Sequence, residues 1–425
     1  MSLAVCLLCI LLMPLATAGL ALIHQGLGRS RSAAHAMLAT LCALSITAIV
    51  FVLIGFAWAG FPTGLSHSFH LAGKSWDWLG NEPFFAAHLS SSLLQTPYIA
   101  LVLAFQMFAV GLATLIPISS GSDRWRLTSI CTWSILFAGL FFPLFAHWVW
   151  GAGWLSQLTP LFGLPPFTDV GGAGVIQVIG GLAALSVAWI LGPRQGKYAD
   201  EVATAIPGHN IVQVLFGCLL ALIGWIGLDS AASMLFHGAT SVQVIVVAIN
   251  AMLSAAGGCL AAVLFTRLRY RKPDASLSAN GWIAGLVAGS ASCGLTSPLA
   301  TIVIGIVAGT LVTLLVETLE LKLFIDDPGG AISVHLAAAL WGLIAFGIFG
   351  PATGSRAALL LAQLVGIATL LGVMFPLIHI GNLLLNKLVR FRVDADGDWQ
   401  GMDIRELGAG AYPEFVVHAD EFVPR

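Results

Sequence analysis

Apolar segments of membrane-spanning length alternate with short polar or glycine- and proline-rich gaps along almost the whole chain. A helix needs about 20 mainly apolar residues to cross a hydrocarbon core ~30 Å thick. The pattern therefore predicts an all-α polytopic membrane protein with eleven transmembrane helices. The expected spans are 2–27, 35–61, 94–119, 126–150, 169–192, 207–229, 241–267, 279–294, 297–318, 329–350 and 357–387, of which 279–294 is the shortest.

Positive charge orients these helices. When the odd-numbered connections are placed in the cytoplasm, all of the 18 Lys and Arg residues except Lys74 and Arg356 fall on that side. Because cytoplasmic loops are enriched in Lys and Arg, the N-terminus is predicted outside and the C-terminus inside. This predicts a transmembrane domain over 1–387 and a cytoplasmic tail over 388–425, in a plasma (inner) membrane.

The first apolar run allows two interpretations. Its Ala16-Thr17-Ala18 resembles a signal-peptide cleavage site. However, the run lacks a charged start and continues to Leu27, which favours a first membrane helix.

One short motif occurs twice. Asp-Val-Gly-Gly-Ala-Gly-Val-Ile-Gln spans 169–177, and Asp-Pro-Gly-Gly-Ala-Ile-Ser-Val-His spans 327–335. Each copy opens an apolar run, so its aspartate is expected at a helix N-terminus. Eight residues at ~1.5 Å each carry Gln177 and His335 about 12 Å inward, near the midplane of the membrane.

The predicted topology makes these two helices run in opposite directions. Opposed copies that meet at mid-membrane are the signature of an inverted repeat with a central substrate site. The repeat relates helices 1–5 to helices 6–10 and leaves the eleventh as an extra helix.

Composition supports the membrane assignment and excludes other classes. The chain is 58% hydrophobic and 9% charged, with a mean hydropathy of +0.94, whereas soluble domains carry about 25% charged residues. Nothing indicates a nucleic-acid partner, a nucleotide-binding P-loop or a soluble catalytic domain. The seven cysteines lie in apolar runs without CxxC spacing, which favours buried small side chains over disulfides or metal ligands. No cofactor is expected.

A set of ordered motifs resembles the ammonium transporter family (Amt, with the related Mep and Rh proteins). They include Gly-Leu-Ala-Leu-Ile-His-Gln-Gly at 19–26, His-Trp-Val-Trp-Gly at 147–151, Phe-Thr-Asp-Val-Gly-Gly at 167–172, Pro-Gly-His-Asn at 207–210, Asp-Asp-Pro at 326–328 and Ala-Tyr-Pro-Glu at 411–414. The resemblance runs nearly from end to end.

The resemblance implies a homotrimer in the lipid bilayer with one narrow apolar pore through each subunit. It further implies an outer vestibule that binds ammonium, two stacked phenylalanines as a gate, and paired histidines below them. In the family, a PII-type signalling protein can dock at the tail. Only N–H bonds would change, so the protein is not expected to be an enzyme.

Three residues match family positions directly. Trp150 falls on the vestibule tryptophan, whose ring face can attract a cation, although tryptophans also form belts at the membrane interface. Asp169 matches an aspartate near the site, where helix capping is the larger effect and attraction of ammonium the other. His335 matches the second pore histidine, and an intramembrane ionisable group favours function over a role in core packing.

Other positions depart from the family pattern. Gln177 stands at the first pore histidine, and Leu228 at the second gate phenylalanine. Asp229 replaces an asparagine. Phe108 is the candidate for the first gate ring, although the spacing of this segment is one residue short.

The vestibule serine of the family is also missing. Ala232 occupies its position, with Ser230 and Ser233 nearby as possible substitutes. An alanine removes a hydrogen-bond acceptor for ammonium.

These departures leave more than one function open. Gln177 can hydrogen-bond to His335, but it cannot titrate near neutral pH. The default is an ammonium transporter. The alternative is a non-conducting ammonium sensor that signals through its tail to a cytoplasmic regulator or output domain, and a Rh-like channel for carbon dioxide is a third option.

Overall fold

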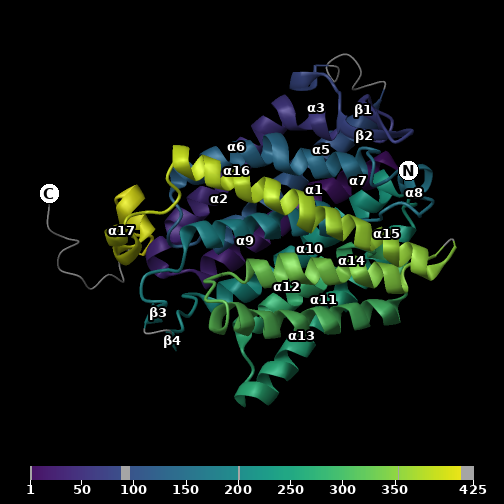
Figure 1. Cartoon of the computed structure of the whole chain (residues 1–425). Coiled ribbons are helices and arrows are strands. Elements are labelled where there is room, and N and C mark those ends of the chain that lie inside the picture. The colour runs from purple at the N-terminus through teal and green to yellow at the C-terminus, as the bar shows by residue number, and fades with distance from the viewer. Residues whose placement is uncertain (1, 88–95, 200–201, 353, 413–425) are drawn as a thin grey trace.

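The computed structural model describes residues 2–87, 96–199, 202–352 and 354–412, and long helices fill most of it (Figure 1). Within these residues, ten helical stretches are long and apolar enough to cross a membrane. They are Leu3–Leu27, Ser30–Ala59, Pro97–Ser120, Leu127–Trp150, Ala173–Leu191, Ile211–Phe236, Gln243–Tyr270, Pro298–Leu321, Ile332–Phe349 and Arg356–Leu388.

Each of these stretches overlaps a predicted span. The remaining prediction, 279–294, overlaps α12 (Ala275–Ser290), a helix of 16 residues. The helix begins earlier than predicted because the carboxylate of Asp274 caps it by accepting a hydrogen bond from Leu277 N at 2.8 Å. A polytopic, mainly helical membrane protein is thus confirmed with ten helices of spanning length, and α12 is a shorter one.

The α-helices besides α12 are α1 (Leu3–Leu27), α2 (Ala33–Val50), α3 (Phe56–Ala59), α5 (Pro97–Ser120), α6 (Leu127–Leu136), α7 (Phe142–Trp150), α8 (Leu158–Phe162), α9 (Ile179–Leu191), α10 (Ile211–Phe236), α11 (Gln243–Tyr270), α13 (Pro298–Leu321), α14 (Ala338–Phe349), α15 (Arg356–Thr369), α16 (Phe375–Leu388) and α17 (Ala395–Gln400). Short 3-10 turns are η1 (Ser30–Ser32), η3 (Phe84–Ala86) and η6 (Cys293–Leu295). Short π-helical turns are η2 (Phe51–Gly55), η4 (Phe137–Phe141), η5 (Ala173–Val178), η7 (Ile332–Ala337), η8 (Leu370–Met374) and η9 (Asp403–Leu407).

The strands of the described residues form two small antiparallel pairs. Strands β1 (Ser66–Leu71) and β2 (Lys74–Gly80) form a hairpin in the loop between α3 and α5, with Phe69 opposite Trp76. Strands β3 (Tyr198–Ala199) and β4 (Val202–Ala203) form the other pair.

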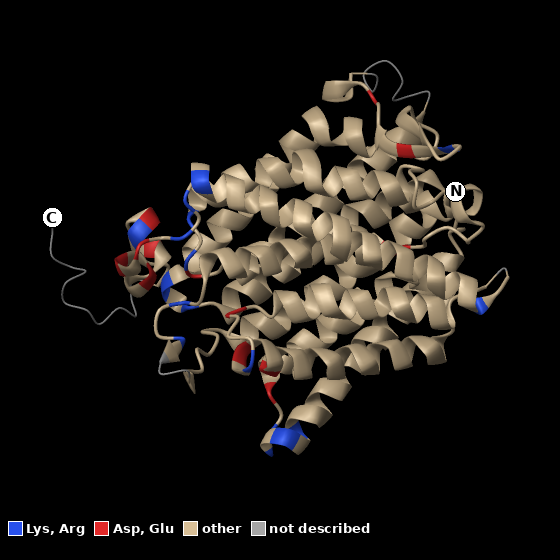
Figure 2. Ribbon diagram, in the orientation of Figure 1, with Lys and Arg blue, Asp and Glu red and all other residues tan. Residues whose placement is uncertain are grey.

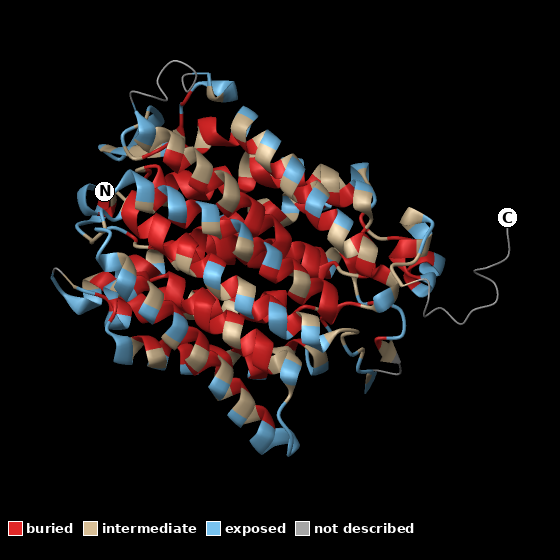
Figure 3. Ribbon diagram, turned by 180° about the vertical axis from the view of Figure 1, so that it is seen from behind, coloured by how far each residue is buried: buried red, intermediate tan, exposed pale blue. Residues whose placement is uncertain are grey.

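Side-chain burial follows the pattern expected for a membrane bundle. Buried residues fill the interior, while many residues on the outer helix faces are exposed (Figure 3). Large apolar side chains such as Leu11, Phe216 and Leu260 are more than half exposed. A soluble protein rarely exposes so much apolar surface, so lipid is the expected contact.

The most extensive helix–helix packing joins α1 and α10. Small residues let the two backbones approach closely. A Cβ atom on Gly19 would lie 2.5 Å from the carbonyl oxygen of Gly217, and one on Gly224 would collide with the backbone of Ala16. This contact fixes α1, which carries part of the site described below.

Lys and Arg gather at one end of the bundle, the end that carries α17 and is called the basic end here (Figure 2). The tail docks on this end through acidic side chains. Asp403 accepts hydrogen bonds from His35 N at 2.7 Å and Ala34 N at 3.1 Å, and Glu406 accepts one from Leu127 N at 2.7 Å. The tail carboxylates therefore cap the N-termini of α2 and α6, where free N–H groups favour negative charge.

Candidate functional site

The two copies of the repeated motif have the same local structure. In each, the second glycine has a positive φ, +86° at Gly172 and +69° at Gly330. The preceding aspartate then accepts a hydrogen bond from the amide five residues later, at 2.7 Å in both copies: Asp169 from Gly174, and Asp327 from Ile332. A glycine is needed where φ is positive, and each carboxylate satisfies a free N–H at the start of a helix.

Helix capping by Asp169 yields a first testable expectation. Its carboxylate also accepts a hydrogen bond from Val175 N at 2.9 Å, so Asp169→Ala leaves two buried amides without their acceptor. We expect the free energy of unfolding to fall by about 1–3 kcal/mol and the melting temperature in detergent to fall with it. Asp169→Asn, which keeps one acceptor oxygen, should lose less.

The matched control is Asp396→Ala, which removes an exposed aspartate of α17. Its melting temperature should stay that of the unaltered protein, since surface substitutions change stability little. A melting temperature for Asp169→Ala equal to that of this control would refute the capping role.

The ends of the two motifs meet. The Nδ1 atom of His335 lies 2.7 Å from the Oε1 atom of Gln177, and both residues are almost fully buried. An amide oxygen can only accept a hydrogen bond, so Nδ1 of His335 carries the proton and donates it. Nε2 of the neutral ring then remains as an acceptor.

A second imidazole lies next to this pair. His24, in the last turn of α1, contacts His335 edge to face, with ring centroids 6.4 Å apart and an interplanar angle of 84°. Sequence reasoning placed His24 inside the first-helix motif without giving it a role. The available signal was an ionisable residue within an apolar helix, which favours function by default.

Trp150 anchors an aromatic cluster on the other side of the motifs. Its ring stacks on Phe236 with centroids 4.9 Å apart, and it meets Phe105 edge to face at 5.4 Å. Its Nε1 atom donates a hydrogen bond to the carbonyl oxygen of Asp169 at 3.1 Å. This bond fixes the indole against the first copy of the motif, and Phe236 covers one of its faces.

The structure places Phe105, and not the predicted Phe108, beside Trp150. Phe105 is fully buried against Trp150, whereas Phe108 is partly exposed in an apolar groove that includes Pro14, Met37 and Leu44. Phe108 is therefore not brought to the aromatic cluster. Phe105 and Phe108 are three residues apart, nearly one helical turn, so both lie on a similar face of α5 and only the packing of Trp150 and Phe236 selects Phe105.

The remaining predicted residues lie on α10, one to two turns before Phe236. Leu228 is fully buried. The hydroxyl of Ser233 donates to the carbonyl oxygen of Asp229 at 2.7 Å within the helix, while the buried hydroxyl of Ser230 has no hydrogen-bond partner among the described residues. Of the two serines, only Ser233 therefore already donates its hydroxyl hydrogen within the helix.

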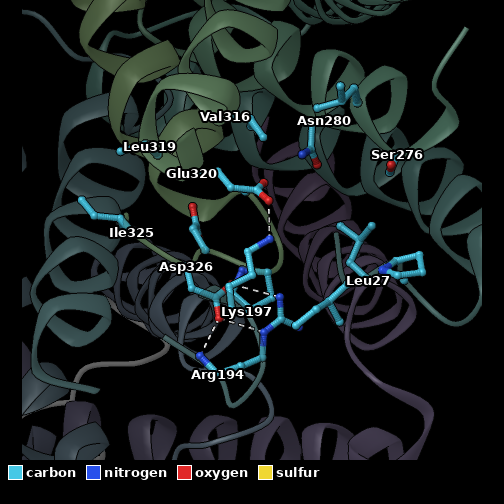
Figure 4. A pocket seen from close by; sticks show the side chains of 17 residues that line it. Leu27, Arg194, Lys197, Ser276, Asn280, Val316, Leu319, Glu320, Ile325 and Asp326 are labelled. Carbon is cyan, nitrogen blue, oxygen red and sulfur yellow. Dashed lines mark hydrogen bonds and ion pairs between the residues drawn. The ribbon is translucent and has the colours of Figure 1, made fainter. Parts of the chain in front are cut away.

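A cavity of about 140 Å³ opens at the basic end (Figure 4). Its wall contains Leu27, at the end of α1, together with Asp327 and Gly330 of the second motif copy. Arg194 pairs there with Asp326, and Lys197 with Glu320. In the described part of the chain, no group of three or more His, Cys, Asp or Glu side chains could hold a metal ion.

Comparison with known proteins gives a consistent picture. The family model described as Ammonium Transporter Family matches residues 4–412. The chain is 33% identical to ammonium transporter Amt2 of Archaeoglobus fulgidus over 96% of this chain and 88% of that protein. It is 29% identical to an ammonium transporter of Bacillus subtilis over 96% and 97% of the two chains.

Solved structures agree with this fold. A protein described as Sensor Amt Protein has a TM-score of 0.85 at 26% identity, covering 95% of this chain and 97% of its own. Candida albicans Mep2 has a TM-score of 0.80 at 22% identity, covering 97% and 90%, which supports the fold alone.

Proposed function

This chain belongs to the ammonium transporter family, and from that premise we propose that it binds ammonium in an outer vestibule beside Trp150 and admits it to a narrow apolar pore lined by Gln177 and His335. The observation that carries the proposal is the 2.7 Å hydrogen bond between these two side chains, which joins the two motif copies deep in the bundle. Polar groups buried inside a membrane protein are costly and mark substrate paths.

The aromatic cluster suits a cation site. With Phe236 stacked on one face of Trp150, ammonium would meet the other face, for a gain of about 0.5–2 kcal/mol. The carboxylate of Asp169 would add negative potential that attracts ammonium. The hydroxyl of Ser230 would offer a hydrogen-bond acceptor for it. In this proposal Phe105, and not Phe108, is the first side chain of the gate, and Leu228 is the second.

Below the gate, ammonium releases a proton and moves as ammonia, because a dry apolar pore strongly disfavours an ion. The released proton crosses separately and rejoins ammonia on the inner side, so that one net charge moves with each ammonium and a current results. The exchange concerns N–H bonds only, so the protein acts as a transporter and not as an enzyme.

The proposed topology has eleven spanning helices with α12 as the eighth, an inverted 5+5 repeat and one extra helix. The equal hydrogen bonds of Asp169 and Asp327 support the repeat. The gathering of Lys and Arg at one end supports an external N-terminus and a cytoplasmic tail (Figure 2). The plasma (inner) membrane, a homotrimer and a PII-type partner at the tail are proposed from the family resemblance.

The test is electrogenic current from purified protein on solid-supported membranes when ammonium is added. We expect a current in the unaltered protein. Trp150→Leu should raise the ammonium concentration that gives half-maximal current by about 2- to 30-fold, since the cation–π contact is lost. Trp189→Leu, an exposed tryptophan of α9, is the matched control and should leave this concentration unchanged.

A non-conducting sensor is the second candidate. It is favoured by the likeness to the sensor Amt protein and by the docked tail, which contacts the starts of α2 and α6 and the segment before α10. Tyr412 OH, for example, lies 3.2 Å from Nε2 of His209 and 3.3 Å from Nε2 of Gln25, the neighbour of His24.

In the sensor case, ammonium should change hydrogen exchange in the tail while no current flows. Ammonium binding seen by calorimetry with unchanged tail exchange would count against this candidate. Absence of both current and binding would refute both functions.

A further inference from the structure

Position 177 holds a glutamine where the family resemblance implies a histidine, yet two imidazoles still meet in the bundle. They are His335 and His24, whose rings stand edge to face with centroids 6.4 Å apart. The two residues come from η7 and α1, so the second imidazole is supplied by a different helix from the one that carries Gln177. Both side chains are nearly buried, with 2% and 7% of their surface exposed.

His24 lies beside His335 and close to Gly329 of the second motif copy, near the cavity at the basic end. It is three residues from Leu27, which lines that cavity. The second motif copy is in contact at this point, where a Cβ atom on Gly329 would lie 3.5 Å from Cδ2 of His24 and would collide with the hydroxyl of Ser119. Gly329 thus leaves room at this point, and its neighbours Pro328 and Gly330 also line the cavity.

The hydrogen bond to Gln177 determines which nitrogen of His335 donates and which one accepts. Because Nδ1 of His335 donates to Gln177, the acceptor atom Nε2 is left for a ligand. The neutral imidazole of His24 adds a further hydrogen-bond donor and a further acceptor beside His335. Gln177, His335 and His24 therefore form a series of polar groups that leads toward the polar cavity at the basic end.

We propose that His24 is the second pore imidazole of this protein and binds ammonia between His335 and the cavity at the basic end. The proposal rests on the proposed function and names a residue of that path. Gln177 then acts as a positioning residue that holds the tautomer of His335, while the two imidazoles contact the transported molecule.

Two substitutions test this role. His24→Phe keeps a ring of similar size and removes both nitrogens, and His24→Asn keeps a hydrogen-bonding side chain. We expect the ammonium current to fall about tenfold in His24→Phe and by less in His24→Asn, since one hydrogen-bond partner is lost in the first. His379→Phe is the matched control. His379 lies on α16 and forms a hydrogen bond with Ser186, and the His379→Phe variant should carry the same current as the unaltered protein.

Nitrogen-15 NMR of the histidine rings tests the binding role of His24 independently of whether the protein transports ammonium. In protein labelled with nitrogen-15 at histidine, ammonium should shift the ring signals of both His335 and His24, each identified by its loss in the Phe variant. The shift at His24 is expected even if the unaltered protein carries no current, because binding alone produces it.

Two results would overturn the role of His24. One is a His24→Phe variant that folds, as judged by its melting temperature, and carries the unaltered current. The other is a His24 signal that does not move when the His335 signal does. If His24→Phe does not fold, His24→Asn and the nitrogen-15 spectra of the unaltered protein decide.

Discussion

Arg194→Met is expected to lower the free energy of unfolding by about 3–5 kcal/mol, the range found when one partner of a buried ion pair is removed. Arg194 is almost fully buried at the basic end. Its Nε and Nη2 atoms donate to the two oxygens of Asp326 at 2.9 and 3.0 Å, and Nη1 donates to Asp123 at 2.9 Å. Methionine has a similar length and no charge, so two buried carboxylates lose their main partner.

The state of Asp326 supports this expectation. Burial alone would raise the pKa of its carboxyl group, but the guanidinium groups of Arg124 and Arg194 outweigh burial and hold the pKa well below its ordinary value. A lowered pKa in the folded state contributes stability above the ordinary pKa of aspartate, and this stability is lost as the pH falls through the folded value. The ion pair is therefore complete at neutral pH, where the measurement is made.

Thermal unfolding in detergent measures the effect. Arg405→Met is the matched control, because Arg405 pairs with Asp394 on the surface and such pairs contribute about 0–1 kcal/mol. Adding Asp326→Asn to Arg194→Met should restore part of the loss by removing the stranded charge. A melting temperature for Arg194→Met within the range of the Arg405→Met control would contradict the prediction.

Hydrophobic patterning was sufficient to predict the helices, because spans of about 20 apolar residues have few alternatives in a membrane protein. The repeated motif also predicted that Gln177 and His335 lie deep in the bundle. Their contact follows from two motifs with the same capping geometry, at Asp169 and Asp327, that start helices packed against one another.

The finer parts of the site depend on packing that spacing does not encode. Phe105 and Phe108 are both plausible on α5, and only the position of Trp150 and Phe236 selects the first. His24 was part of a recognised motif, but its contact with His335 depends on how closely α1 approaches the bundle. That approach is set by Gly19 and Gly224 and cannot be read from one helix alone.

The second large effect concerns the buried pair in the pore. We expect Gln177→Leu to reduce the ammonium current by about tenfold to a hundredfold. Leucine leaves the Nδ1–H group of His335 buried without an acceptor, which makes this tautomer less favourable by about 1–3 kcal/mol, and each 1.4 kcal/mol changes its population tenfold. The tautomer of His335 is then no longer held, so Nε2 is not kept as an acceptor for ammonia.

The chain offers a close control in Gln363 of α15. It is also fully buried, and neither of its amide atoms has a hydrogen-bond partner among the described residues. Gln363→Leu removes the same atoms from the interior without stranding another group, so the current should stay unchanged. Equal currents from Gln177→Leu and Gln363→Leu would show that the contact with His335 is irrelevant to conduction.

Gln177→His gives the complementary result, because histidine keeps a hydrogen-bond partner for His335 and adds a group that can titrate between pH 5 and 8. We expect a current at least as large as that of the unaltered protein, with a pH dependence that differs from that of the glutamine protein because one more titratable group is present. If the unaltered protein binds ammonium in calorimetry but carries no current, it is a receptor. A current gained in Gln177→His would then mean that one side chain separates sensing from transport on this scaffold.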